Sequence, residues 1–121
     1  MLKKILVLDD NMDILEVVHE VLTYEHFEVN STSDSKNIVT VAENYRPDLI
    51  ILDYKLMDDN GGEICRRIKS HHQLHKTPVI IFSAYTNKTD FYSFGCDAVI
   101  AKPFDLTELI DTVNSCLQLS L

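Results

Sequence analysis

The sequence predicts an α/β fold: a doubly wound, five-stranded parallel sheet between two layers of helices. Two observations carry this prediction. Four short segments are continuous apolar runs and a fifth alternates weakly, as expected for strands of a sheet covered on both faces. Between these segments, apolar residues recur at the spacing of amphipathic helices. Strands that alternate with helices form right-handed crossovers, which place helices on both faces of a parallel sheet.

The sequence predicts some of these strands more clearly than others. The run 49–52 is wholly aliphatic and leads directly into Asp53, which makes it the clearest buried strand. Phe27 and Val29 alternate with polar residues, so the second strand is weaker. The five strands are expected at residues 5–8, 27–31, 48–53, 78–82 and 98–101.

Capping and breaking residues mark the helices. Short polar side chains that can accept the first free N–H groups are expected to start three helices, at Asn11, at residues 33–35 and at Asp105. A further helix follows the turn residues Asn60 and Gly61. Pro47 ends the second helix. Residues 87–94 form a helix of at most two turns, which Gly95 closes in the left-handed conformation.

Composition bounds the class of protein. A chain of 121 residues with 45% hydrophobic residues suits one globular domain, so we expect a single domain over residues 1–121. The net charge of −8 argues against direct binding of nucleic acid, which favours a basic face. Cys65, Cys96 and Cys116 form no CxxC pair and are expected to be free thiols in a reducing compartment. Without a membrane-span or signal-peptide pattern, we expect a cytoplasmic protein that does not contact membranes.

Polar residues follow the predicted strands at the points where these strands end. They are Asp9 and Asp10 after the first strand, Asp53 after the third, Ser83 after the fourth and Lys102 after the fifth. Ligands of parallel α/β sheets bind beyond the carboxyl ends of the strands. We therefore expect these five side chains to form one site.

The chemistry of these residues favours phosphoryl transfer to Asp53. Three carboxylates in one place would repel each other unless a cation lay among them, and oxygen ligands favour Mg²⁺. Lys102 carries a charge suited to a phosphoryl oxygen, and Ser83 offers a hydroxyl donor. A carboxylate nucleophile, a metal and a lysine together indicate transfer by positioning and charge neutralisation.

The chain also resembles the receiver domains of two-component response regulators over nearly its whole length. The shared features are the acid pair 9–10, Leu52-Asp53, Gly61, the tripeptide 82–84 and the segment 95–105. The resemblance implies a flavodoxin-like sheet order of 2-1-3-4-5. It also implies that Asp53 receives a phosphoryl group from a histidine kinase or histidine phosphotransfer protein. The modified domain would then switch a protein–protein interaction, in two-component signalling or a phosphorelay.

Residue roles also follow from the resemblance. Asp10 and Asp53 would bind Mg²⁺ directly, the Lys55 backbone carbonyl would be a third ligand, and Asp9 would act mostly through metal-bound water. Ser83 and Lys102 would bind the phosphoryl oxygens, and Lys102–Pro103 would be a cis peptide. Beyond its own phosphorylation and dephosphorylation, such a domain would not be an enzyme.

Several positions depart from the family pattern. Met57 replaces a usual proline, and Val99 replaces an aromatic ring that turns inward on activation. The segment from Ser83 to Gly95 is also short by about one helical turn, so the fourth helix should be stunted. We further hypothesise that the side chains of Lys55 and Tyr85 shield the acyl phosphate from water.

Two other functions use related chemistry. A small phosphohydrolase of haloacid-dehalogenase type also uses an Asp nucleophile, Mg²⁺ and a lysine, but it places the nucleophile on the first strand in a D-x-D pattern. A flavin-binding domain would need a phosphate-cradling loop where Asp9 and Asp10 lie. The chain is expected to be either a stand-alone receiver or a part cut from a larger regulator.

Other polar clusters have simpler interpretations. His71 and His75 have the spacing of metal ligands on a helix, but no further ligand completes the set, so a solvated helix end is expected. Asp58 and Asp59 are expected to be turn residues, and the basic run 66–69 a solvated helix face.

Overall fold

The predicted doubly wound sheet is confirmed. The computed structural model describes residues 1–84 and 90–119. Its sheet has the order β2-β1-β3-β4-β5, and every neighbouring pair of strands is parallel. The strands are β1 Lys4–Leu8, β2 Glu28–Thr32, β3 Leu49–Asp53, β4 Val79–Ser83 and β5 Ala98–Ala101.

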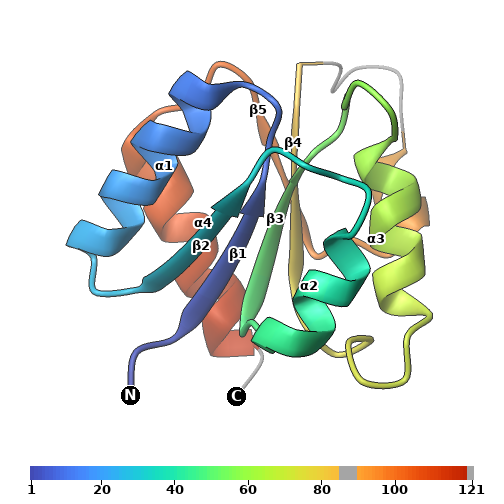
Figure 1. Ribbon diagram of the computed structural model, residues 1–121. Coiled ribbons are helices and arrows are strands. Elements are labelled where there is room, and N and C mark those ends of the chain that lie inside the picture. The colour runs from blue at the N-terminus through green and yellow to red at the C-terminus, as the bar shows by residue number, and fades with distance from the viewer. Residues whose placement is uncertain (85–89, 120–121) are drawn as a thin grey trace.

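Helices cover both faces of the sheet. Figure 1 shows α1 and α4 on one side of the strands and α2 and α3 on the other. The helices are α1 Met12–Tyr24, α2 Ile38–Tyr45, α3 Gly61–Lys69, the 3₁₀ helix η1 Phe91–Phe94, and α4 Leu106–Leu119. None of the helices in the described ranges is long and apolar enough to cross a membrane.

The core forms two layers because side chains of a strand alternate between its faces. In β1, Leu6 and Leu8 pack beneath α2 and α3, whereas Ile5 and Val7 pack beneath α1 and α4. All residues of β3 and β4 are buried, which accounts for their unbroken apolar runs. The central strands are thus fixed between two apolar layers, and they hold their carboxyl ends in place.

Most predicted helix boundaries agree with the structure. The Asn11 side chain accepts hydrogen bonds from the backbone N–H groups of Asp13 and Ile14. The Asp105 carboxylate accepts one from Glu108 N at 2.7 Å. The second helix ends at Tyr45, one residue before a left-handed Arg46 and two before Pro47, as predicted.

The predicted start of the second helix is wrong. Residues 33–35 do not cap it, because α2 begins at Ile38 and its N-cap residue, Asn37, makes no side-chain capping bond. The Asp34 carboxylate instead accepts a hydrogen bond from Lys36 N at 2.9 Å, which stabilises a local turn. Capping residues and turn residues have the same composition, so the sequence did not distinguish the two.

The segment before β5 contains a single turn of 3₁₀ helix. Of the predicted helix at residues 87–94, the part at 87–89 lies outside the described residues, and Phe91–Phe94 forms η1. Gly95 follows η1 with a φ of 94°, in the predicted left-handed conformation. The described part therefore agrees with the expected stunted helix.

Gly61 lets the start of α3 approach the end of β3. A methyl group at this position would overlap the backbone carbonyl oxygen of Asp53 and press on Tyr54 Cα. The Gly61 N–H also donates to the Tyr54 carbonyl at 2.8 Å. The first turn of α3 is thus fixed directly against the residue that the sheet presents at its edge.

We predict that Gly61→Ala lowers the free energy of unfolding by about 2–3 kcal/mol, because two backbone segments would have to separate. Urea unfolding followed by circular dichroism measures this loss. Thr107→Ala, an exposed change in α4, is the control and should alter the value by less than about 0.5 kcal/mol. Equal stabilities of the two variants would contradict the close packing of α3 on β3.

Candidate functional site

The register of the sheet brings the predicted site residues to one edge. Leu8 lies opposite Leu52 in the β1–β3 pair, so Asp9 follows β1 beside Asp53 at the end of β3. Ser83 is the last residue of β4 and lies opposite Ala101, after which Lys102 leaves β5. The backbone N–H of Lys102 donates to the Ser83 carbonyl at 2.8 Å, which continues the β4–β5 ladder by one residue.

Three carboxylates lie together at this edge. One oxygen from each of Asp9, Asp10 and Asp53 lies within 4.8 Å of the others, and no other such group of three potential metal ligands occurs in residues 1–84 and 90–119. Asp9 is 0% exposed and Asp53 is 6% exposed, whereas Asp10 is the most accessible of the three. Hard oxygen donors with one open side suit Mg²⁺, which retains several waters when it binds proteins.

Lys102 holds the two buried acids together. Its ammonium nitrogen lies 2.9 Å from Asp9 Oδ2 and 2.9 Å from Asp53 Oδ1. The other Asp9 oxygen accepts a hydrogen bond from Asn11 N at 2.9 Å, so Asp9 is fixed on both sides. The single positive charge of Lys102, which follows β5, therefore contacts an acid at the end of β1 and another at the end of β3.

The electrostatics of Asp53 and Lys102 follow from burial and from these contacts. Burial raises the pKa of Asp53, the Lys102 hydrogen bond opposes this rise, and the negative charges of Asp9 and Asp10 add to it. Burial alone would lower the pKa of Lys102, but its hydrogen bonds with Asp9 and Asp53 outweigh this effect and raise it. The site thus has more negative charge than Lys102 neutralises, as a cation-binding site requires.

Several contacts shape the loop between β3 and α3, which contains Met57. Lys55 and Asn60 form an antiparallel bridge, and Leu56 N donates to the Asp59 carbonyl at 3.3 Å. Asp59 pairs with Arg67 of α3, and the Asn60 side chain caps α3. These contacts hold the Lys55 backbone near the site without a proline.

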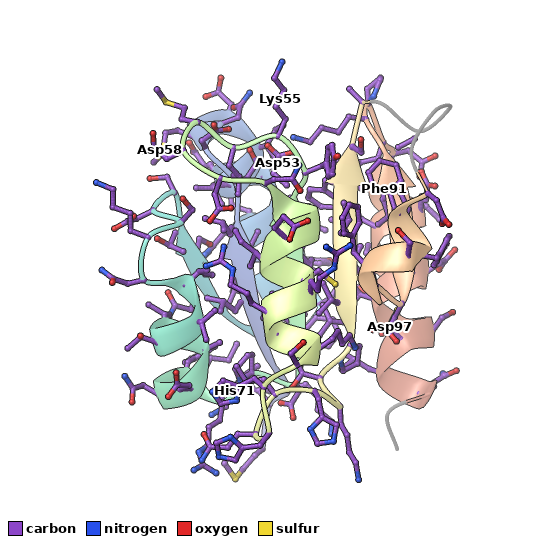
Figure 2. All side chains as sticks on the ribbon, turned by 90° about the vertical axis from the view of Figure 1, so that its right-hand side faces the viewer. Asp53, Lys55, Asp58, His71, Phe91 and Asp97 are labelled. Carbon is purple, nitrogen blue, oxygen red and sulfur yellow. The ribbon has the colours of Figure 1, made fainter. Side chains whose placement is uncertain are left out.

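Lys55 and Tyr85 carry the long side chains that were predicted to shield the site. Lys55 projects away from the top of the molecule, on the same rim as Asp53 (Figure 2). Tyr85 lies outside the described residues. The role of the Lys55 carbonyl as a metal ligand and the shielding hypothesis both remain predictions.

The other sequence candidates lie elsewhere or have local partners. His71 is at the opposite end of the molecule from Asp53, stacked on His72 and 3.5 Å from a Glu43 oxygen (Figure 2). The basic residues of α3 pair with acids of the same chain, as Arg66–Glu63, Arg67–Asp59 and Lys69–Asp97. The predicted solvated helix end is wrong for His71, which lies in the turns after α3 with its side chain only 17% exposed. Arg66 and Arg67 are half-exposed, as expected for a solvated helix face, whereas the Lys69 side chain is only 19% exposed.

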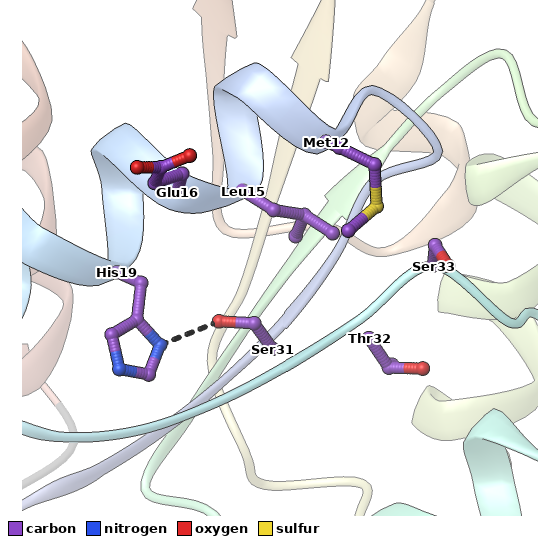
Figure 3. Close-up of a pocket in the computed structure, with 7 residues that line it drawn as sticks. All are labelled: Met12, Leu15, Glu16, His19, Ser31, Thr32 and Ser33. Atoms are coloured by element: carbon purple, nitrogen blue, oxygen red, sulfur yellow. Dashed lines mark hydrogen bonds between the residues drawn. The ribbon is translucent and has the colours of Figure 1, made fainter.

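Two surface hollows were not predicted from the sequence. One, of about 450 Å³, lies between α1 and the edge strand β2, where His19 Nδ1 is 2.9 Å from Ser31 Oγ (Figure 3). The other, of about 490 Å³, is mostly apolar and lies against Lys102; Ile14, Val17, Phe104 and Leu106 contribute to its lining. Val17 and Leu106 are exposed hydrophobic residues, but neither marks a surface in the sequence because each also fits a helical core pattern.

Comparison with known proteins finds one family. The model of the response regulator receiver domain matches residues 5–114. Response regulator ArlR of Staphylococcus aureus is 34% identical over 118 residues, which cover 95% of this chain and 52% of that protein. The chain thus spans about half the length of the curated relatives it matches.

Solved structures share the fold. A response regulator from Chloroflexus aurantiacus superposes with a TM-score of 0.92 at 23% identity, covering 98% of this chain and 99% of that chain. Chemotaxis response regulator CheY4 of Vibrio cholerae gives 0.90 at 24% identity, covering 96% and 99%. The receiver domain of sensor histidine kinase PA1611 from Pseudomonas aeruginosa, solved with magnesium in its active site cleft, gives 0.89 at 24%, covering 98% and 99%.

The raised pKa of Asp53 implies that this residue lowers the free energy of unfolding at neutral pH. A carboxyl whose pKa is higher in the folded than in the unfolded state binds protons more readily when folded, so its ionisation at neutral pH opposes folding. We expect Asp53→Asn to raise the free energy of unfolding at pH 7, because it removes a charge that burial and the neighbouring acids disfavour more than the Lys102 contact favours it. The gain should shrink as pH falls through the raised pKa and vanish below the ordinary Asp value.

Urea unfolding at a series of pH values measures this difference. Asp58→Asn removes an exposed charge from the adjacent loop and controls for the general effect of lowering the negative charge. An Asp53→Asn protein less stable than the unaltered chain at pH 7 would contradict the excess of negative charge at the site.

Proposed function

The chain belongs to the response regulator receiver domain family, and from this premise we propose that Asp53 is its phosphoacceptor. The observation that supports the proposal best is the contact of Asp53 with Lys102 at 2.9 Å inside a cluster of three carboxylates. Asp53 is the member that ends the central strand β3. We propose that all of residues 1–121 act as one receiver domain.

The proposed donor is a phosphohistidine, carried by a histidine kinase or a histidine phosphotransfer protein. An Asp53 carboxylate oxygen forms a P–O bond while the P–N bond to the donor imidazole breaks. The imidazole nitrogen leaves with the bonding electron pair and takes up a proton. In this reaction the protein mainly positions the reactants and neutralises charge.

The residues around Asp53 have separate roles in this proposal. Lys102 keeps its proton and neutralises charge on a phosphoryl oxygen, and Ser83 donates a hydrogen bond to another oxygen. Asp10, Asp53 and the Lys55 backbone carbonyl would bind Mg²⁺ directly, while Asp9 would hold its water ligands. When bound, Mg²⁺ would offset the repulsion between the carboxylates and the incoming phosphoryl group.

The apolar hollow against Lys102 suits the donor protein. It lies next to the one cation that contacts Asp53 in the described residues, and Ile14 and Phe104 contribute apolar lining. A donor that covers this hollow would exclude water from the transfer site and bring its histidine to the rim. We propose that the modified domain then switches a protein–protein interaction, and that the domain catalyses only its own phosphorylation and dephosphorylation.

The setting of the domain is a further part of the proposal. Cys65, Cys96 and Cys116 are free and buried thiols, which supports a reducing compartment, and we propose the cytoplasm. Direct contact with nucleic acid or membranes is not part of the proposed role. The haloacid-dehalogenase alternative is not supported, because the family model that matches the chain is that of the receiver domain.

Acetyl phosphate and Mg²⁺ should add one phosphoryl group to the chain, because a small phosphodonor needs no donor protein. Intact-mass spectrometry measures the gain. Asp53→Asn should abolish it, whereas Asp58→Asn, a change in the adjacent loop, should retain it. Chelation of Mg²⁺ should slow the reaction at least tenfold.

A mass gain of the same size in the Asp53→Asn variant would contradict the assignment of Asp53 as the phosphoacceptor. Turnover of p-nitrophenyl phosphate without a stable mass gain would indicate a phosphohydrolase instead.

A further inference from the structure

Tyr54 connects the phosphoacceptor to η1 by direct aromatic contact. It is the residue after Asp53, and its ring meets Phe91 of η1 edge-on, with centroids 4.9 Å apart and an angle of 88°. The same ring lies 6.2 Å from the ring of Phe94 at the other end of η1. Figure 2 shows Asp53 and Phe91 in the same half of the molecule.

The backbone of Tyr54 is held on both sides. Its N–H donates to the Phe82 carbonyl of β4 at 2.9 Å, and its carbonyl accepts from Gly61 N at the start of α3. Asp53 and Tyr54 are consecutive residues, and Gly61 packs against the backbone of both. A displacement of the β3 end must therefore reach this ring.

Packing rather than capping fixes the position of η1. It is a single 3₁₀ turn, and its N-cap residue Asp90 makes no side-chain capping bond. Phe91 is 3% exposed, and Cys96 Sγ donates to its carbonyl at 3.4 Å. An element held mainly by aromatic side chains will follow the rings that it packs on.

The other side of η1 lies closely on α3. A methyl group at Gly62 would come within 2.6 Å of the Phe94 ring, so the absence of a side chain there makes room for Phe94. The Arg66 guanidinium lies over the same ring, 5.0 Å from its centroid. Tyr54, Phe91 and Phe94, which we call the aromatic cluster, thus join β3, α3 and η1.

Val99 of β5 packs against the same core layer but carries no ring. We propose that the aromatic cluster transmits phosphorylation of Asp53 to η1, with Tyr54 as the positioning residue. This inference rests on the proposed function of Asp53.

The experiment compares amide spectra of ¹⁵N-labelled protein before and after phosphorylation by acetyl phosphate with Mg²⁺. In the unaltered chain, the amides of residues 91–95 should shift together with those around Asp53. Tyr54→Leu should reduce the shifts at 91–95 by at least half while leaving the extent of phosphorylation, measured by mass, unchanged. Tyr54→Phe keeps the ring and should restore them.

Tyr92→Leu is the matched control, because Tyr92 lies in η1 but is 61% exposed. The Tyr92→Leu variant should retain the amide shifts that phosphorylation causes at the neighbouring residues of η1. Phe91→Leu removes the partner ring from the opposite side and should reproduce the effect of Tyr54→Leu. The spectrum of each variant without phosphodonor shows whether it remains folded.

The outcomes separate this inference from the proposed function. A phosphorylated protein whose η1 amides do not move, or move equally in Tyr54→Leu, would overturn the inference and leave the phosphoacceptor assignment intact. Failure of the unaltered chain to become phosphorylated would overturn the proposed function and with it the inference.

Discussion

The contact of one ammonium group with two buried carboxylates is the interaction on which this structure depends. Lys102 lies 2.9 Å from both Asp9 and Asp53, at the edge where β1, β3 and β5 end. Removing charged groups from water is costly unless they are paired, and a pair of acids is tolerated here because the lysine lies between them. The same arrangement leaves negative charge in excess, which a bound cation would offset before an anionic phosphoryl group approaches Lys102.

The apolar strands determine where the charged groups of the site lie. β3 and β4 are buried along their whole length, and their register leaves Asp53 and Ser83 at the carboxyl edge. Gly61 then brings α3 against the Asp53 backbone, and Tyr54 extends from the same point into the aromatic cluster. Core packing, site geometry and the proposed path of the signal therefore meet at two consecutive residues, Asp53 and Tyr54, at the end of β3.

Much of this could be predicted from the sequence because it depends on local patterns. Apolar runs gave the strands, and residues that interrupt them at their ends gave the site. The start of α2 could not be predicted, since Asp34 and Asn37 suit a turn and a cap equally well. The aromatic cluster was missed for a different reason. Tyr54 is distant in sequence from Phe91 and Phe94, and only the tertiary structure shows that its ring meets theirs. Likewise, Arg67 of α3 pairs with Asp59 of the preceding loop through a contact that no sequence pattern marks.

The most direct test of the account is to locate the modified residue chemically. Borohydride reduces an acyl phosphate to a primary alcohol, so reduction of the phosphorylated chain followed by peptide mass mapping identifies the carboxylate that carried the phosphoryl group. We predict that the side chain of Asp53 is reduced to the alcohol and that Asp9 and Asp10 are unchanged. Reduction at Asp9 or Asp10, or a phosphoryl group that resists borohydride and maps to Ser83 or a histidine, would contradict it.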